Sequence, residues 1–247
     1  MNKPFLSIVI PAYNEEARLP GSLAKIAAFL HQQPYRAEVL VVENGSSDRT
    51  YAIAQEFQQK HPIFHAMHIE VRGKGIAVKT GMLAAQGDYR FICDADLSMP
   101  IAEVNNFIPP VLENCDIAIA SREAPGAQRI GEPAYRHFIG RVFNSFVKLM
   151  ALPGLQDTQC GFKCFSASAA QQLFPMQTIQ GWTFDVEVLY LARQLGYTIH
   201  EVPIHWYFDS HSKVKFLRDS LQMTSDLFRI RRRSIKKNYE SEQNNGH

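Results

Sequence analysis

The chain has 247 residues, of which 46% are hydrophobic, and a formal net charge of +2. A chain of this size can bury one large α/β core with a short appendage. The net charge is too small to indicate a nucleic-acid-binding protein, which needs a clustered excess of Lys and Arg on one surface. The four cysteines contain no Cys-x-x-Cys pair, so we expect buried thiols in a reducing cytosol rather than a zinc site or a disulfide.

The sequence also indicates which kinds of membrane association to expect. No run of eighteen or more apolar residues occurs, so we expect no segment to span the ~30 Å hydrocarbon core of a bilayer. Met1-Asn2-Lys3-Pro4 leads directly into an apolar strand, without the apolar region of a secretory signal peptide. We therefore expect a cytoplasmic protein whose contact with a membrane is at most peripheral.

Short β-rich runs alternate with helical patterns over the first 120 residues. The expected strands are 6–10, 38–42, 64–69, 89–93 and 116–120. The expected helices are 18–30, 48–59, 75–85 and 101–112. This alternation predicts an α/β fold with a Rossmann-like, mostly parallel sheet flanked by helices.

The second half is less regular. The expected elements are helices at 136–150 and 183–195, a strand at 197–202 and a long basic amphipathic segment at 213–233. We divide the chain into a main domain at 1–210, a basic amphipathic segment at 211–236 and a disordered polar tail at 237–247.

Acidic residues follow three of the expected strands. The segments are Pro11-Ala12-Tyr13-Asn14-Glu15-Glu16, Glu43-Asn44-Gly45-Ser46-Ser47-Asp48 and Asp94-Ala95-Asp96. Ligands of such sheets bind beyond the carboxyl ends of the strands, so we expect these acids to converge on one edge. Glu43 ends a strand that we expect to be buried, and the base or ribose of a nucleotide could supply the hydrogen bonds that this carboxylate needs.

Asp94 and Asp96 suit a hard divalent cation. Residues two apart on an extended chain point to the same side, and such ions prefer oxygen ligands. A surface turn explains an isolated triplet of this kind just as well, but its position after a strand favours the metal site. The sequence thus predicts a metal site here.

Arg72-Gly73-Lys74-Gly75 is a basic turn before an expected helix. It matches neither the P-loop pattern nor the dinucleotide-binding pattern. The N-terminus of a helix favours the binding of phosphate groups, so this turn is a candidate phosphate-binding site. The alternative is a solvated loop without a ligand.

Four segments, in this order and spacing, resemble the family 2 glycosyltransferases of GT-A fold. They are residues 7–16, 43–50, 72–75 and 94–98. Within that family, later segments are similar to the polyprenyl-phosphate and dolichyl-phosphate hexosyltransferases, of glucosyltransferase or mannosyltransferase type. They are residues 121–122, 157–163, 181–187, 201–203 and 212–220. The resemblance covers roughly residues 5–233.

The resemblance implies a metal-dependent enzyme whose donor is a UDP- or GDP-hexose. It implies that Mg²⁺ or Mn²⁺ and the donor are held by Asp94, Ala95 and Asp96, with Asp96 as the direct metal ligand and Asp94 as its partner. The implied nucleotide pocket consists of Pro11, Ala12, Tyr13, Glu15, Glu43 and Asp48, with Lys74 near the phosphates. Ser98 stands where some relatives have a metal-binding Gln, so the third metal ligand is left unassigned.

The resemblance implies a lipid phosphate as the acceptor. Such a phosphate is already largely dianionic at pH 7, because its second pKa is about 6, so it needs no strong general base. The site must instead hold two anions together. The candidate cations for the acceptor phosphate are Arg122, Arg136, Lys213 and Arg218. Asp157 is implied to lie beside the acceptor and the reacting sugar, so the expected catalytic residues are Asp94, Asp96, Asp157 and Arg122.

A hydroxyl acceptor would change the chemistry. A carboxylate would then have to take the proton of the hydroxyl, and Asp157 or Asp185 would become the general base. Asp185 and Glu187 lie two residues apart on an expected helix, so at most one of them points into the site.

Two apolar stripes indicate helices that lie on an anionic membrane surface. One consists of Val214, Leu217, Leu221, Leu227 and Phe228, with Lys and Arg elsewhere on the helix. The other consists of Phe138, Val142, Phe143, Phe146, Val147 and Met150. Packing of these stripes against the domain is the alternative.

We therefore expect an inverting enzyme that transfers a hexose, glucose before mannose, to a polyprenyl or dolichyl phosphate at the cytoplasmic face of a membrane. One alternative is a family member that acts on a saccharide or other hydroxyl. The other is a non-catalytic protein that binds a nucleotide-sugar or tethers to membranes, against which the intact Asp94, Asp96 and Asp157 argue. The sequence assigns no oligomeric state.

Overall fold

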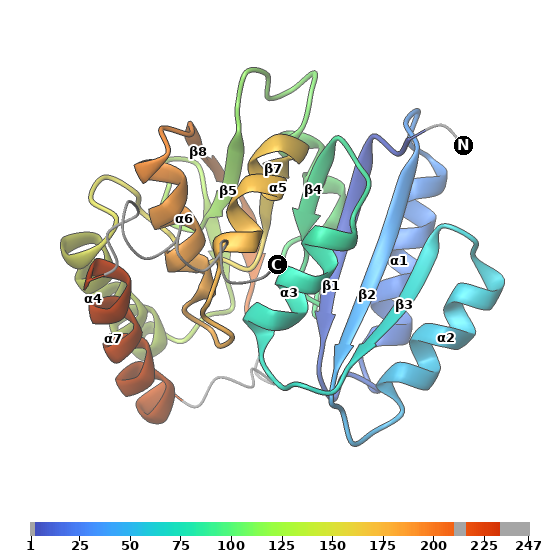
Figure 1. The fold of residues 1–247 in the computed structure, drawn as a ribbon, viewed down its shortest axis with the longest axis horizontal. Helices are drawn as coiled ribbons and strands as arrows, with labels where there is room; N and C mark the ends of the chain where they lie inside the picture. The colour runs from blue at the N-terminus through green and yellow to red at the C-terminus, as the bar shows by residue number, and fades with distance from the viewer. Residues whose placement is uncertain (1–2, 210–215, 233–247) are drawn as a thin grey trace, which may run out of the picture.

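A seven-stranded sheet forms the centre of the protein. The structure, a computed structural model, describes residues 3–209 and 216–232 (Figure 1). The strand order is β3-β2-β1-β4-β7-β5-β8. The strands are β1 (Leu6–Ala12), β2 (Ala37–Asn44), β3 (Phe64–Ile69), β4 (Tyr89–Ile92), β5 (Ile117–Ser121), β7 (Lys163–Ser166) and β8 (Ile199–Pro203). Only β7 runs antiparallel to its neighbours, β4 and β5, so the mostly parallel sheet predicted from the sequence is confirmed.

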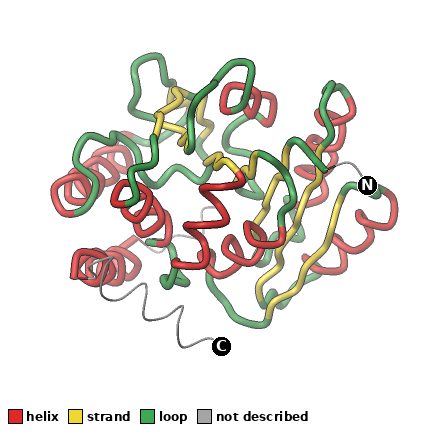
Figure 2. The backbone as a smooth tube through the Cα atoms, turned by 45° about the horizontal axis from the view of Figure 1, so that its top comes forward, coloured by secondary structure: helices red, strands yellow, loops and turns green. Residues whose placement is uncertain are grey.

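Helices cover both faces of the sheet (Figures 1 and 2). One apolar core contains α3 (Lys74–Ala84), α5 (Ala167–Met176) and α6 (Phe184–Gln194), and the other contains α1 (Leu19–His31), α2 (Thr50–Lys60) and the 3₁₀ helix η1 (Ile101–Phe107). Strand β1 shows how the sequence produces these layers. Leu6, Ile8 and Ile10 pack into the second core and Val9 into the first, because alternate side chains of a strand point to opposite faces.

Several elements differ from the sequence-based expectation. The helix expected at 101–112 is only η1, because Pro109 and Pro110 lack the amide hydrogens that a longer helix needs. Strand β7 and helix α5 were not expected. The short strands β6 (Gln128–Ile130) and β9 (His205–Tyr207) were also missed, and they form a small second sheet.

Helices α4 (Ala134–Met150) and α7 (Phe216–Arg232) pack together on one flank (Figure 1). Leu227 and Ile230 of α7 are fully buried in the first core, and Thr183 donates a 3.0 Å hydrogen bond to Asp226. The later part of α7 therefore belongs to the body of the domain. The boundary expected after residue 210 and the tail at 237–247 lie outside the described residues. None of the helices that the structure describes is long and apolar enough to cross a membrane.

Candidate active site

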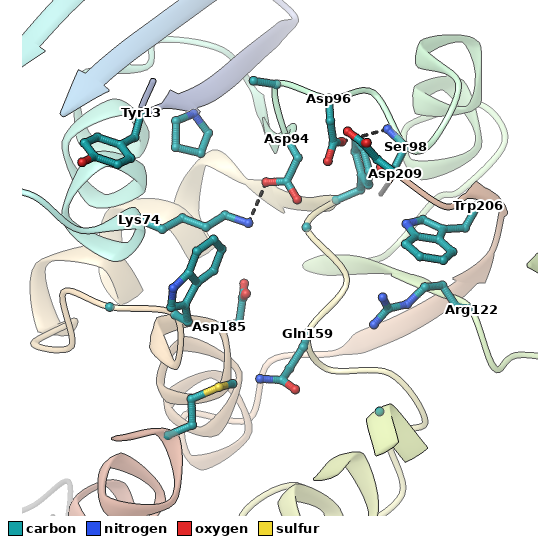
Figure 3. A pocket seen from close by; sticks show the side chains of 18 of the residues that line it. Tyr13, Lys74, Asp94, Asp96, Ser98, Arg122, Gln159, Asp185, Trp206 and Asp209 are labelled. Atoms are coloured by element: carbon teal, nitrogen blue, oxygen red, sulfur yellow. Dashed lines mark hydrogen bonds and ion pairs between the residues drawn. The ribbon is translucent and has the colours of Figure 1, made fainter. Parts of the chain in front are cut away.

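A cleft of about 1100 Å³ opens at the carboxyl ends of β1, β2 and β4 (Figure 3). Its first wall includes Pro11, Tyr13, Glu15, Asn44, Arg72, Lys74, Asp94, Ala95 and Asp96. Its second wall includes Arg122, Glu123, Arg129, Glu132, Arg136, Gln159, Trp206 and Phe208, and Trp182 and Asp185 lie near Lys74 (Figure 3). The edge of the sheet predicted to carry the ligand is therefore the edge that forms the cleft.

Asp94 and Asp96 both point into the cleft (Figure 3). Oδ1 of Asp94 lies 2.6 Å from Nζ of Lys74, and Oδ1 of Asp96 accepts a 2.9 Å hydrogen bond from the backbone N–H of Ser98. Burial and the neighbouring Asp94 raise the pKa of Asp96. Burial alone would lower the pKa of Lys74. The negative charges of the nearby carboxylates have the larger effect, so the pKa of Lys74 is raised. Lys74 thus pairs directly with Asp94, and its charge also acts on the nearby Asp96.

This acidic pair fits a divalent cation in part. No cluster of three or more His, Cys, Asp or Glu side chains suited to a metal occurs among the described residues. Asp94 and Asp96 therefore offer two oxygen ligands, which suits an ion that takes its other ligands from water and a diphosphate. The ammonium of Lys74 shows that Asp94 already accommodates a cation. Asp209 also lies near Asp96, but its carboxylate pairs with Arg18 (Figure 3).

Gly161 makes room for Asp94. A Cβ atom at this position would lie 1.7 Å from Oδ2 of Asp94. The carboxylate of Asp94 is therefore held between the ammonium of Lys74 and the backbone of Gly161.

Some of the residues predicted for the nucleotide pocket line the cleft. Pro11, Tyr13, Glu15 and Lys74 line the cleft, whereas Ala12, Glu43 and Asp48 do not. The guanidinium of Arg72, which the sequence analysis did not assign to the pocket, lies 5.3 Å from the centre of the Tyr13 ring.

Glu43 and Asp48 find their hydrogen bonds within the chain. The buried carboxylate of Glu43 accepts from the backbone N–H of Ser46 and contacts Nδ1 of His68 at 2.5 Å. Asp48 accepts from the backbone N–H of Thr50 at 2.9 Å and from that of Glu16 at 3.1 Å. The hydrogen bonds that we expected a nucleotide to give Glu43 are thus supplied by the protein.

On the second wall, Arg122 is paired with Asp157. Nε and Nη2 of Arg122 lie 2.7 and 2.9 Å from the two carboxylate oxygens. Burial alone would raise the pKa of Asp157, but the guanidinium and its hydrogen bonds lower that pKa to about 2. Arg122 lies 5.3 Å from the centre of the Trp206 ring, and Asp157 sits behind it, outside the lining of the cleft.

Two further arginines line this wall. Arg129, which sequence reasoning missed, lies 2.6 Å from Glu123 and 2.6 Å from Glu132. Arg136 lies 5.0 Å from the centre of the Phe208 ring and has no ion-pair partner among the described residues. Arg136 is thus a cation of the cleft whose charge the described chain does not neutralise.

The sequence predicts two further cations for an acceptor phosphate, Lys213 and Arg218. Lys213 lies outside the described residues. Arg218 belongs to α7, but its side chain also lies outside the described part of the protein.

Asp185 and Glu187 have separate roles, as their spacing predicted. Asp185 lines the cleft and pairs with Lys163 at 2.8 Å. Burial raises the pKa of Asp185 above its ordinary range. Glu187 points away and accepts from the backbone N–H groups of Thr178 and Ile179 at 2.9 and 2.7 Å.

Residues 7–174 match the family model described as "Glycosyl transferase family 2". The chain belongs to glycosyl transferase family 2. The family 2 resemblance of the sequence is therefore confirmed, and the protein is a glycosyltransferase rather than a non-catalytic binding protein.

Curated family members resemble this glycosyltransferase along most of its length. Dolichyl-phosphate beta-glucosyltransferase of Dictyostelium discoideum is 34% identical over 245 residues, which cover 94% of this chain and 75% of the relative. Its namesake from Drosophila melanogaster is 36% identical over 240 residues, which cover 91% and 74% of the two chains.

The fold of this glycosyltransferase is GT-A-like. Glucosyl-3-phosphoglycerate synthase from Mycobacterium tuberculosis, in complex with Mn²⁺, uridine diphosphate and glucosyl-3-phosphoglycerate, matches with a TM-score of 0.67. The identity is 18%, and the match covers 92% of this chain and 80% of that one. At this identity the likeness concerns the fold.

Proposed function

We propose that this glycosyltransferase moves glucose from UDP-glucose to a polyprenyl or dolichyl phosphate, with inversion at the anomeric carbon. The relatives named above are dolichyl-phosphate beta-glucosyltransferases, and the mycobacterial synthase was solved with Mn²⁺ and UDP-glucose or with Mg²⁺ and UDP. Mannose from GDP-mannose is the second choice of donor. Both dolichyl-phosphate relatives are about one third identical to this chain.

The first wall of the cleft is the proposed donor site. Asp96 would hold Mg²⁺ or Mn²⁺ directly, and Asp94 would hold it together with the donor. The metal would neutralise the leaving diphosphate. Arg72 and Lys74 lie on the same wall and would meet the diphosphate oxygens. Tyr13 would lie against the base. Arg72 has no ion-pair partner among the described residues, so its charge is available to an anion.

The unpaired charge of Arg136 is the main observation that supports an anionic acceptor. The acids Glu15, Asp94, Glu123, Glu132, Asp185 and Asp209 of the cleft are each paired with a Lys or Arg. Arg136, by contrast, lies in the first turn of α4, contacts the Phe208 ring and has no ion-pair partner among the described residues. A cation left unpaired in a largely neutralised wall favours binding of an anion from solution. We assign to it the phosphate of the acceptor, with Arg122 as a partly engaged neighbour.

The proposed step is a single displacement. An oxygen of the acceptor phosphate attacks the anomeric carbon as the bond from that carbon to the donor diphosphate breaks, and the nucleoside diphosphate leaves. The attacking oxygen already carries charge at neutral pH, so no group has to remove a proton. This agrees with Asp157, whose low pKa makes it a weak base.

The flank formed by α4 and α7 is the proposed membrane contact. Tyr135, Val142 and Leu149 lie seven residues apart along α4 and are 66%, 56% and 79% exposed. Phe228 of α7 is 52% exposed. Val147 and Leu227, by contrast, are fully buried, so each predicted stripe is divided between core and surface.

Basic residues surround this flank. Arg141, Arg229 and Arg232 are exposed. Anionic lipids attract such residues by about 1 kcal/mol for each Lys or Arg near the surface. The cleft reaches this flank, because its lining includes Gly140 and Asn144 of α4 and Met223 of α7. A lipid phosphate could therefore enter from the cytoplasmic membrane surface.

A hydroxyl acceptor is the second candidate function. Asp185 lines the cleft, and burial raises its pKa, which makes its carboxylate a stronger base. Asp157 does not share this property. Asp185 is therefore the base of this alternative.

A transfer assay tests the proposal. The protein and Mn²⁺ are incubated with radiolabelled UDP-glucose, GDP-mannose or another nucleotide-sugar and a short polyprenyl phosphate. We expect label from UDP-glucose to move into the organic phase. Hydrolysis of the donor without any transfer would favour a soluble acceptor.

A further inference from the structure

Lys74 occupies the acidic centre of the cleft in a specific way. Its Nζ lies 2.6 Å from Oδ1 of Asp94 and 5.3 Å from the centre of the Trp182 ring. The other oxygen of Asp94 lies against the backbone of Gly161. A divalent cation that binds Oδ1 of Asp94 must therefore displace the ammonium or share the oxygen with it.

The ammonium can move without leaving an anionic environment. Asp185 contributes to the charge stabilisation of Lys74, and the face of Trp182 attracts a cation. Asp185 is itself held by Lys163 at 2.8 Å, so it does not compete strongly for Lys74. A diphosphate beside the acidic pair would be the strongest new partner for the ammonium.

We propose that Lys74 is the internal counter-ion of the Asp94–Asp96 pair in the free enzyme, and that it transfers to the donor diphosphate when metal and donor bind. The inference rests on the metal-dependent donor site proposed above. Lys74 then weakens the binding of metal alone and strengthens the binding of the donor. Because linkage is reciprocal, Lys74 makes metal and nucleotide bind cooperatively.

Mn²⁺ binding, measured by electron paramagnetic resonance with and without UDP, tests this role. Lys74→Gln is compared with wild type and with Lys79→Gln, which removes a charge from the same helix outside the lining of the cleft. Without UDP, we expect Lys74→Gln to bind Mn²⁺ about tenfold more tightly than wild type, because two carboxylates lose their cation. UDP should raise the Mn²⁺ affinity of wild type and of Lys79→Gln, and raise that of Lys74→Gln about tenfold less.

Unchanged or weaker binding of Mn²⁺ to Lys74→Gln without UDP would overturn the inference. Asp96→Asn separates this failure from failure of the donor site itself. If Asp96→Asn keeps the wild-type affinity for Mn²⁺ in the presence of UDP, the proposed metal site is wrong. If it loses that affinity while Lys74→Gln behaves as wild type, only the role of Lys74 is wrong.

A measurement on the wild-type protein does not depend on the folding of Lys74→Gln. The side-chain ammonium signal of Lys74 in ¹⁵N-labelled protein, assigned with Lys74→Arg, is followed during titration with Mg²⁺ and UDP. We expect this signal to shift when both are present. A signal that stays in place while Mg²⁺ and UDP bind would contradict the transfer of the ammonium.

Discussion

The guanidinium of Arg122 donates one hydrogen bond to each oxygen of the Asp157 carboxylate, and the side chain of Asp157 is 2% exposed. The backbone N–H of Arg122 adds a third contact, at 3.0 Å. The pair keeps the pKa of Asp157 at about 2, so Asp157 stays ionised throughout the neutral range. It therefore forms a fixed support for the second wall of the cleft rather than a group that exchanges protons.

Removal of Arg122 should destabilise the protein. Arg122→Met leaves the carboxylate of Asp157 buried without its cation, and we expect a loss of about 3 kcal/mol in the free energy of unfolding. Urea denaturation at pH 7 measures this. The double variant Arg122→Met/Asp157→Leu removes both charges and should recover part of the loss. Recovery of nothing would show that the two side chains do not act as a pair.

The same pair predicts a pH dependence. Folding lowers the pKa of Asp157 from its ordinary value near 3.8 to about 2, so the ionised form is favoured in the folded state. The stabilisation is present above the unfolded pKa and is lost as the pH falls from about 4 towards 2. Urea denaturation over this range should show a steeper acid loss of stability in wild type than in Asp157→Asn. Equal slopes would contradict the assigned pKa.

Asp94→Ala and Asp96→Ala should each abolish transfer and metal-dependent binding of the nucleotide-sugar. Each variant removes one of the two carboxylates of the proposed metal site, both of which point into the cleft (Figure 3). Calorimetry with UDP-glucose and Mg²⁺ measures the binding, and Asp88→Ala, which removes a surface acid paired with Lys3, is the control. Purified variants that retain both properties would refute the site.

Gly161→Ala should disturb the same site without changing any charge. The new methyl group would lie 1.7 Å from Oδ2 of Asp94, so that carboxylate must move. We expect metal-dependent binding of UDP-glucose to fall at least tenfold, on the order of one lost charge-assisted contact. Gly21→Ala is the control, because no atom lies within 4 Å of its added Cβ. If both variants bind as wild type does, the packing of Gly161 against Asp94 has no functional role.

Three exposed apolar residues of α4 should mediate binding to anionic liposomes. Tyr135, Val142 and Leu149 are exposed apolar residues that the domain does not cover. The triple Ser variant should lose most of its cosedimentation with phosphatidylglycerol vesicles, and added salt should weaken wild-type binding. Val111→Ser, at a 64% exposed position outside α4 and α7, should bind as wild type does. Wild type that fails to bind even at low salt would count against a lipid acceptor.

The pattern of the first half predicted its strands and helices well. Runs such as Ile8-Val9-Ile10 are apolar on both faces, because the strands lie between two layers of helices. The point where each apolar run ends therefore indicated the edge of the sheet at which the cleft lies. The helix expected at 101–112 ends at Phe107 in the structure, because the apolar period of the sequence continues past the point where Pro109 and Pro110 stop a helix.

The second half was harder to predict because its contacts join distant segments. Strand β7 follows Gly161 by only two residues and has four residues, a length that carries little periodic signal. The sequence did not indicate that Arg129 lines the cleft. Mixed charges such as Arg129, Glu123 and Glu132 are common on protein surfaces, so they gave no sign of a site. Sequence order alone also could not show that Glu43 would be satisfied by Ser46 and His68.

The assignment of Arg136 to the acceptor is tested most directly with two acceptors that differ only in their charge. Transfer of glucose from UDP-glucose is measured to a short polyprenyl phosphate and to the corresponding polyprenol, with wild type, Arg136→Gln and Arg36→Gln. We expect wild type and Arg36→Gln, a control at an exposed site outside the cleft and the proposed membrane contact, to glycosylate only the phosphate, and Arg136→Gln to lose about 100-fold in kcat/KM for it. Transfer to the polyprenol, or full activity of Arg136→Gln on the phosphate, would contradict the account.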